Sequence, residues 1–451
     1  MGVNDSKAFR FSHGPTILVL SWAGLILVGA GLLCTPAAAT GESVPFLDAL
    51  FTSTSAVCVT GLATIDVGRE LSPFGQGVLL GLIQIGGLGI STVSTLLLVI
   101  AGRATISQYY ATQKDLAAVR VRPLRLLLWA VTFTLVAEGI GTVILSSRMG
   151  GSFPSWEGVF HSVSAFCNAG FSLYSSNLMD FRTDVTVNAT VAGLIATGGI
   201  GFIALRQLSV WLWGAIRRHR VPMYLHTRTV LLGSVVLWLS GALIFLLLER
   251  NNTMADLSWP HKVLAAAFQS VTPRTAGYNT LDFGAMREPT LIFTVLLMLV
   301  GGAPGSCAGG LKITTVVVVI ASVRARLRGD EQVSLLRRTV PTEIVSRAFY
   351  TLTLGLLLVL VMVTILLLTE EQIVGGRHVD RLTGMLFETT SAFGTVGLST
   401  GVTPLLSPAG KIVIILTMFC GRLGPLAVAL AVFRQRPRPR YEYPKEELAT
   451  G

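Results

Sequence analysis

The sequence predicts an all-α membrane protein in which four repeated units surround one central pore. Three observations lead to this prediction. The chain of 451 residues is 51% hydrophobic and only 13% charged, whereas soluble domains usually contain about 25% charged residues. Apolar runs of about 20 residues recur along the chain, and each is long enough to cross a bilayer as a helix. A glycine-containing string also recurs four times, which indicates a repeat architecture.

The four strings share a pattern of aromatic, hydroxyl and glycine residues. Each has a Phe nine or ten residues before its glycine, followed by two hydroxyl residues that are two positions apart. The glycines and their hydroxyl pairs are Gly61 with Ser53 and Ser55, Gly170 with Ser162 and Ser164, Gly277 with Ser270 and Thr272, and Gly397 with Thr389 and Ser391. Because the glycines are 107 to 120 residues apart, the four units have similar lengths.

Each unit is predicted to contain an outer helix, a pore helix before the glycine, and an inner helix after it. The outer helices are expected near residues 17–33, 124–145, 229–248 and 346–368. The inner helices are expected near residues 74–101, 185–213, 290–323 and 408–433. The pore helices, near residues 45–56, 155–166, 259–271 and 379–392, are too short to span and are expected to re-enter. This gives eight transmembrane helices and four re-entrant pore loops.

The units divide the chain into six segments. Residues 1–16 form a cytoplasmic N-terminus and 434–451 a cytoplasmic tail, and the pore repeats cover 17–101, 124–213, 229–323 and 346–433. Most of the 35 Lys and Arg residues lie in the links on the side of both termini, and basic links face the cytoplasm. Carboxylates such as Asp66, Asp180 and Asp282 gather on the opposite side. A negatively charged mouth there would concentrate cations.

The glycine strings suit a filter for alkali cations. Such an ion exchanges its water shell for other oxygens, and backbone carbonyls supply them without adding a charge. Turning carbonyls inward favours glycine, which lacks a β-carbon. Four ordinary helix-ending glycines are the alternative, but they would not explain the recurring pattern. The predicted filter residues for potassium or sodium are Cys58, Val59, Thr60, Gly61, Cys167, Asn168, Ala169, Gly170, Arg274, Thr275, Ala276, Gly277, Gly394, Thr395, Val396 and Gly397.

The third inner span is interrupted and is a candidate gate. It holds one proline and five glycines within ten residues, and in a helix interior these cost about 3 and about 1 kcal/mol each. We therefore expect the helix to break just below the filter, either as a moving gate or as a static kink. The predicted gate residues are Gly301, Gly302, Ala303, Pro304, Gly305, Ser306, Cys307, Ala308, Gly309, Gly310, Lys312 and Arg422.

Arg422 stands in an apolar span where the first three units have Gly87, Gly199 and Gly302. A lone arginine at membrane depth is costly and indicates a function. Facing the cavity, it would repel cations and shorten the time they stay bound. Alternatively it pairs with Glu138, the carboxylate inside an outer span. Lys312 is either a second barrier or an ordinary helix-end cation.

Two motifs resemble a known family. Val57-Cys-Val-Thr-Gly-Leu62 and Gln84-Ile-Gly-Gly-Leu-Gly89 are similar to the pattern of the KtrB/TrkH/HKT superfamily. One span before the first string favours its KtrB branch, and the resemblance covers nearly the whole chain. It implies a homodimer in a bacterial plasma (inner) membrane that takes up potassium through a gated, channel-like pore.

The resemblance also implies partners and regulation. Sodium often stimulates uptake in this family, and the cytosolic partner is a KtrA-type ring of RCK domains that binds ATP or ADP. Nucleotide is expected only on that partner. The family loop that corresponds to residues 301–310 obstructs the cavity and moves to permit flux. The resemblance likewise supports a pore role for Arg422.

Other functions fit less well. A secondary transporter typically has two inverted repeats, although symport of sodium and potassium with fixed stoichiometry stays open. The five Cys and six His residues are scattered and give no metal or nucleophile pattern, so we expect no enzyme. The net charge of +11 lies in the links without interleaved aromatics, which argues against nucleic acid. The basic tail and residues 324–338 could bind anionic lipid or the regulatory ring.

Overall fold

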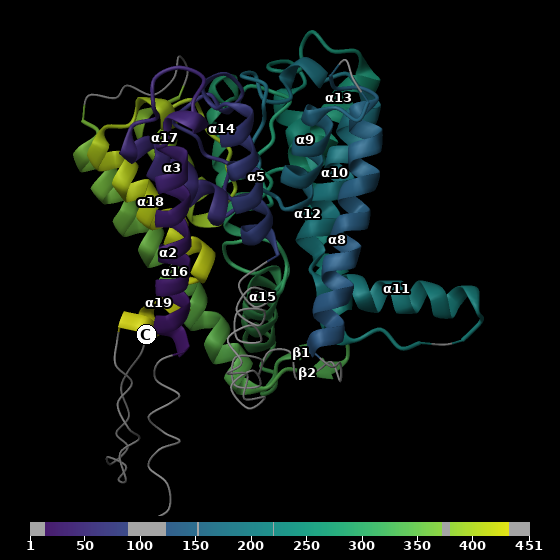
Figure 1. The fold of residues 1–451 in the computed structure, drawn as a ribbon. Coiled ribbons are helices and arrows are strands. Elements are labelled where there is room, and N and C mark those ends of the chain that lie inside the picture. The colour runs from purple at the N-terminus through teal and green to yellow at the C-terminus, as the bar shows by residue number, and fades with distance from the viewer. Residues whose placement is uncertain (1–13, 89–122, 151–152, 220, 372–378, 433–451) are drawn as a thin grey trace, which may run out of the picture.

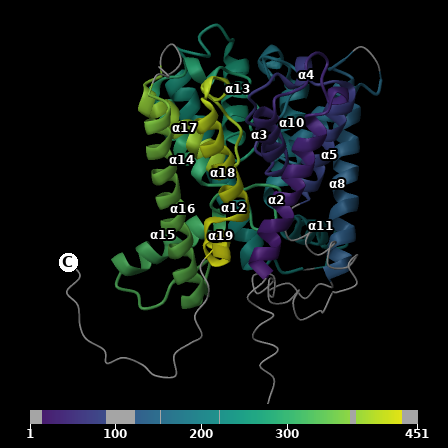
Figure 2. The ribbon, with the colours of Figure 1, turned by 60° about the vertical axis from the view of Figure 1, so that its left-hand side comes forward.

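The computed structural model describes residues 14–88, 123–150, 153–219, 221–371 and 379–432. Their regular secondary structure is helical, as predicted, apart from a small hairpin of β1 (Ser334–Leu335) and β2 (Arg338–Thr339). Most helices run up and down beside one another, and α11 extends sideways beyond them (Figure 1). In the turned view, the purple and blue first units lie beside the green and yellow last ones (Figure 2).

Four long helices lie where outer helices were predicted. They are α2 (Gly14–Leu33), α8 (Pro123–Ser146), α12 (Leu225–Glu249) and α16 (Thr342–Thr369). Within the described ranges, three stretches are long and apolar enough to cross a membrane: Leu128–Ser146, Leu225–Glu249 and Thr342–Thr369. Many Leu, Val and Ile side chains on these helices are exposed, which suits a surface that faces lipid.

Four short helices precede the glycine strings. They are α3 (Phe46–Val57), α9 (Trp156–Phe166), α13 (Trp259–Val271) and α17 (Arg381–Gly394). Each packs against the long helix that comes before it in the chain. In the first two units a serine fixes this contact, because Ser53 Oγ donates to the Ile26 carbonyl at 2.7 Å and Ser162 Oγ to the Glu138 carbonyl at 2.6 Å.

The helices after the strings are shorter than predicted. They are α5 (Pro73–Gly87), α10 (Val185–Ile200), α11 (Phe202–Ile216), α14 (Glu288–Leu299), α15 (Ile313–Leu327), α18 (Pro408–Leu423) and α19 (Pro425–Val432). The links also contain α4 (Val67–Glu70), η1 (Pro36–Ala38), η2 (Met179–Phe181), η3 (Phe283–Ala285) and η4 (Thr403–Leu405). The inner span expected near 74–101 is helical to Gly87, and its residues 89–101 lie outside the described ranges.

Two inner segments were wrongly predicted to be single, unbroken helices. The expected helix at 185–213 breaks at Gly201, where α10 and α11 meet at a bend of 104°. The expected helix at 408–433 breaks at Gly424. Both glycines have φ near 86° and ψ near 140°, a region that is open essentially only to glycine. A helix that reaches such a residue cannot continue.

In three units, a glycine of the inner helix lets that helix pack closely. A β-carbon on Gly86, Gly198 or Gly421 would collide with the backbone carbonyl of Val57, Phe166 or Phe393, respectively. These carbonyls lie at the C-terminal ends of α3, α9 and α17. Small residues therefore let each inner helix touch the end of the short helix in its own unit.

Outer-helix glycines provide a test of this packing. A β-carbon on Gly141 of α8 would lie 2.7 Å from Leu194 Cδ1 and would also collide with Ser162 Oγ, whereas Gly139 has no atom within 4 Å. We expect Gly141→Ala to destabilise the fold by about 1–3 kcal/mol through overpacking. Gly139→Ala should be neutral or slightly stabilising, because alanine favours helix by up to about 1 kcal/mol. Thermal unfolding in detergent measures both, and equal Tm values would contradict the packing.

Candidate functional site

The four glycine strings form a closed ring. A β-carbon on Gly170 would lie 2.7 Å from the carbonyl oxygen of Ala276 in the third string. The same relation holds around the ring, with each glycine facing the residue before the next glycine. The pairs are Gly61 with Ala169, Gly170 with Ala276, Gly277 with Val396, and Gly397 with Thr60. Because the fourth string returns to the first, the strings surround one axis.

The strings also share an uncommon backbone conformation. All four glycines have positive φ, between 69° and 95°. The residue two positions before each glycine is left-handed as well: Val59, Asn168, Thr275 and Thr395, with φ between 50° and 68°. Such residues are uncommon when they are not glycine, and they cluster at functional sites. Left-handed residues at every second position let successive carbonyls point to the same side of a strand.

The second hydroxyl of each pair holds its string in place. The N–H of Gly61 donates to Ser55 Oγ at 3.0 Å, and that of Gly397 donates to Ser391 Oγ at 3.1 Å. In the second string Ser164 Oγ donates to the Phe171 carbonyl at 3.0 Å. In the third, Thr272 Oγ1 donates to the Tyr278 carbonyl. These contacts explain why a hydroxyl residue recurs at this position of every unit.

Three threonine hydroxyls of the strings have no protein partner. Thr60, Thr275 and Thr395 are fully buried, yet their Oγ1 atoms find no hydrogen-bond partner in the described part of the chain. Buried polar atoms are almost always paired. The strings therefore hold oxygen atoms that are available to something other than protein.

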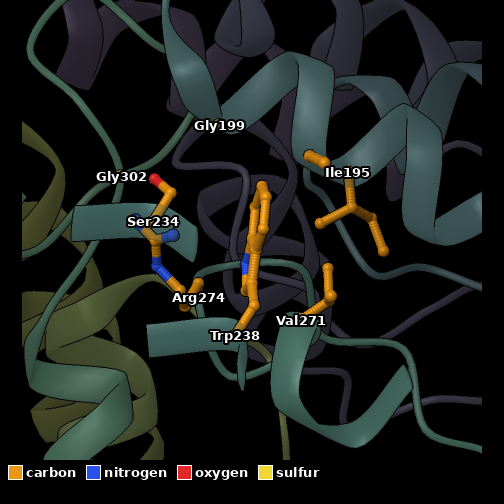
Figure 3. Close-up of a pocket in the computed structure, with 8 residues that line it drawn as sticks. Ile195, Gly199, Ser234, Trp238, Val271, Arg274 and Gly302 are labelled. Atoms are coloured by element: carbon orange, nitrogen blue, oxygen red, sulfur yellow. The ribbon is translucent and has the colours of Figure 1, made fainter. Parts of the chain in front are cut away.

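Arg274 differs from the other predicted filter residues. It stands where the other strings have Cys58, Cys167 and Gly394. Its guanidinium donates to the Gly301 carbonyl at 3.3 Å and lies 5.6 Å from the centre of the Trp238 ring. Figure 3 shows both side chains lining one pocket, beside a residue of the loop that follows α14. The signal that could have revealed this contact was a charge at a position that is small in the other strings.

Residues 300–312 form a non-helical loop between α14 and α15, where the glycine and proline content predicted a break. The loop lies against the strings and against the bend of the second unit. Gly309 would clash with Thr395 if it carried a β-carbon. The N–H of Ala303 donates to the Gly199 carbonyl at 3.0 Å, and that of Phe202 donates to the Gly305 carbonyl at 3.1 Å.

Two further cationic side chains donate hydrogen bonds to carbonyls of this loop. Lys312 Nζ donates to the Ala308 carbonyl at 2.6 Å. Arg422 is buried and donates to the carbonyls of Cys307 and Gly86. Arg274 and Arg422 therefore hold the loop from two other segments, whereas Lys312, the last residue of the loop, forms a hydrogen bond within it.

The alternative pairing of Arg422 with Glu138 is wrong. No ion pair joins these two side chains, both of which lie in the described ranges. The Glu138 carboxylate lies instead 3.8 Å from Cys167 Sγ. Arg422 reaches backbone carbonyls because it projects from α18 toward the loop and α5, which carry those carbonyls.

Two buried glutamates that the sequence analysis missed hold the outer ends of the units. Glu249, at the end of α12, accepts from Thr290 Oγ1 at 2.6 Å. Glu388, inside α17, accepts from Ser399 Oγ at 2.7 Å and from the N–H of Thr400 at 2.8 Å. Their signal in the sequence was a single carboxylate within a largely apolar helix.

Comparison with known proteins identifies relatives over the whole chain. Residues 3–443 match the TrkH family, described as cation transport proteins. The chain is 38% identical to the Ktr system potassium uptake protein B of Bacillus subtilis, over 99% of this chain and 98% of that protein. It is 37% identical to the potassium/sodium uptake protein NtpJ of Enterococcus hirae, over 95% of each.

A solved structure has the same fold. The crystal structure of the potassium transporter TrkH from Vibrio parahaemolyticus superposes with a TM-score of 0.72, covering 94% of this chain and 85% of that one. The sequence identity is 20%, so this likeness concerns the fold alone.

Hydrogen–deuterium exchange tests the three cationic contacts of the loop. A hydrogen bond to a charged group contributes about 1.5–3 kcal/mol, and about 1.4 kcal/mol corresponds to a factor of ten in equilibrium. We expect Arg274→Met, Lys312→Met or Arg422→Met each to speed amide exchange in peptides covering 301–310 by about tenfold or more. Arg148→Met is the control, because Arg148 is exposed and lies outside the loop. Unchanged exchange in all three variants would contradict the anchoring.

Proposed function

This chain belongs to the TrkH family of cation transport proteins, and we propose that it takes up potassium across a bacterial plasma (inner) membrane through a gated, channel-like pore. The observation that carries the proposal is the closed ring of four glycine strings with its repeated left-handed residues. Potassium as the transported ion is supported by the names of the relatives. Such membership indicates a membrane transporter rather than an enzyme.

We assign the strings to a filter formed by four units with eight membrane spans. The units comprise residues 17–101, 124–213, 229–323 and 346–433, and each contributes an outer helix, a re-entrant helix and an inner segment. The contact of each short helix with the long helix before it supports this division. Both termini then lie on the cytoplasmic side, as the distribution of Lys and Arg predicts.

The ion sites in this proposal are the backbone carbonyls of residues 58–61, 167–170, 274–277 and 394–397. Non-helical backbone at membrane depth occurs only where it is buried in protein or lines water. A dehydrated potassium or sodium ion needs several oxygens, which the four converging glycine strings supply. The same strings also hold the unpaired hydroxyls of Thr60, Thr275 and Thr395, which lie one or two residues before the glycines.

The loop 301–310 with Lys312 and Arg422 acts as the gate in this proposal. The loop lies beside the strings, and the hydrogen bonds from Arg274 and Arg422 keep it there, while Lys312 stabilises its internal conformation. Breaking the two arginine bonds without replacing them would cost several kcal/mol, at about 1.5–3 kcal/mol each. The closed arrangement therefore dominates until other contacts compensate. The positive charge of Arg422 also lowers the affinity for cations near the loop.

The free energy that offsets the broken hydrogen bonds of the loop would come from contacts with a partner outside this chain. The relatives are named as parts of a Ktr system, which supports a cytosolic partner, proposed as an RCK ring that binds ATP or ADP. We further propose a homodimer and stimulation by sodium. The alternative, symport of sodium and potassium at fixed stoichiometry, is favoured by the potassium/sodium name of one relative.

Rubidium uptake into proteoliposomes that contain this chain alone tests the pore. Vesicles loaded with potassium should accumulate rubidium, and those loaded with sodium should accumulate less. Arg422→Ala should raise the basal rate by about tenfold, because the loop loses a charged hydrogen bond worth at least about 1.5 kcal/mol. Arg338→Ala in the exposed β2 strand is the control. No flux under either gradient, even with the cytosolic ring added, would refute the channel.

The ring of glycines gives a second test. Gly277→Ala places a β-carbon on the Val396 carbonyl at a residue with φ of 76°, where a side chain costs about 1–2 kcal/mol even without a clash. We expect rubidium uptake to fall at least tenfold and any preference for potassium over sodium to weaken. Gly193→Ala in α10, where no atom lies within 4 Å, should leave both unchanged. Normal selectivity in Gly277→Ala would exclude this ring as the filter.

A further inference from the structure

The helix α11 leaves the bundle at the level of one membrane boundary. It follows α10 at a bend of 104° and extends sideways beyond the other helices (Figure 1). The 16 residues of α10 cover about 24 Å at 1.5 Å per residue, slightly less than the roughly 30 Å of hydrocarbon in a bilayer. The helix α12 then starts its crossing at Leu225. α11 therefore lies along the membrane plane, near the inner edge of the hydrocarbon.

One face of α11 is covered by the chain that returns to α12. Gln207 Nε2 donates to the Pro222 carbonyl at 3.2 Å, and a β-carbon on Gly214 would touch Val221. These two residues are seven apart and share one face of the helix. The returning chain runs below α11 in Figure 1, on the side opposite to the one toward which the long helices extend.

The opposite face of α11 is apolar and uncovered. Leu212, Trp213 and Ile216 expose 49%, 58% and 76% of their surface. Their spacing from Gln207, at 3.6 residues per turn, places all three on the half of the helix that faces away from it. Ser209 shares this face, but its hydroxyl is satisfied by the Arg206 carbonyl at 2.7 Å. Because the returning chain covers the side away from the bundle, this apolar face points toward the bilayer.

The flank beside Trp213 is basic. Arg217 lies four residues after Trp213 and projects from nearly the same side of the helix. Arg206, seven residues before Trp213, shares this side but is only partly exposed, and its Nη1 atom is buried. The Arg217 guanidinium is 4.6 Å from the centre of the Trp213 ring. No Asp or Glu occurs between residues 185 and 248. An apolar face with Trp and a flank of arginines is typical of helices that lie in the interface and bind anionic lipid.

The other end of α11 touches the loop that follows α14. Its first residue, Phe202, donates its N–H to the Gly305 carbonyl, and a β-carbon on Gly201 would lie 3.1 Å from the Pro304 carbonyl. Ala204 packs with Ala303 and Ile313 in one buried cluster. A movement of α11 relative to the bilayer would therefore act directly on the middle of the loop.

We propose that α11 is a binding surface for anionic phospholipid that stabilises the position of the loop 301–310 relative to the membrane. The lipid phosphate interacts with Arg217, while Leu212, Trp213 and Ile216 enter the boundary between headgroups and acyl chains. The effect on flux rests on the proposed function, whereas the lipid contact does not.

A matched pair of tryptophans makes the proposal testable. Trp211 lies four residues after Gln207, just over one helical turn, and therefore shares its covered side. Trp213 lies on the uncovered side, where it exposes 58% of its surface, compared with 38% for Trp211. The same residue type thus occurs on both sides of one helix.

The lipid contact is measured by fluorescence quenching. An NBD label on Trp213→Cys and one on Trp211→Cys are compared in vesicles with and without brominated acyl chains, after subtraction of the label on wild-type protein. We expect strong quenching at 213 and at least threefold weaker quenching at 211. Equal, weak quenching at both positions would overturn the proposal. Efficient disulfide formation between copies through position 213 would also overturn it, since a second copy would then cover the face.

The effect on the gate is measured by rubidium uptake in phosphatidylcholine vesicles with and without phosphatidylglycerol. We expect the uptake rate of the wild type to change by about fivefold on adding the anionic lipid. Trp213→Ala and Arg217→Gln should lose this dependence, whereas Trp211→Ala should keep it. Dependence unchanged in Trp213→Ala and Arg217→Gln would refute the coupling. Absence of flux in every lipid would count against the proposed function, while the quenching result would still decide the lipid contact.

Discussion

Backbone that leaves the helical state at membrane depth must find hydrogen-bond partners within the protein, because lipid offers none. The rest of this structure depends on that constraint. Its non-helical segments at this depth, the four glycine strings and the loop 300–312, are enclosed by helices and held by polar groups from them. Hydroxyls of the short helices hold the strings, and cationic side chains hold the loop. The second hydroxyl of each pair and the buried arginines of this apolar sequence thus have one common physical cause.

The units are alike where they surround the axis and differ where the loop lies. Three inner helices touch the end of their own short helix through a glycine. In the third unit the corresponding Gly301 packs instead against Gly309 of the same loop, so the loop takes the space that a continuing helix would use. The two buried arginines, Arg274 and Arg422, stand at positions that are small in the other units. Departures from the repeat therefore coincide with the loop that we propose as the gate.

The helix breaks at Gly201 and Gly424 show a second consequence of glycine in the inner segments. Gly198 packs against the end of the short helix in its own unit. Gly201, three residues later, instead ends the helix and turns the chain into α11. Both uses leave the same mark in a sequence, because a missing β-carbon permits close approach and left-handed φ alike. Whether a given glycine packs closely or ends a helix depends on the residues that face it, and these come from distant parts of the chain.

The sequence by itself determined the helical class, the positions of the outer and short helices, and the residues at which the strings turn, because hydrophobic length and a fourfold pattern are local properties. It also identified 301–310 as a break, since glycine and proline oppose helix wherever they occur. Only the tertiary structure decided which carbonyls Arg274 and Arg422 contact. It also decided which glycines end a helix and which permit close packing. An arginine side chain is long enough to reach several segments, and its partners here are carbonyls whose positions depend on how the units close around the axis.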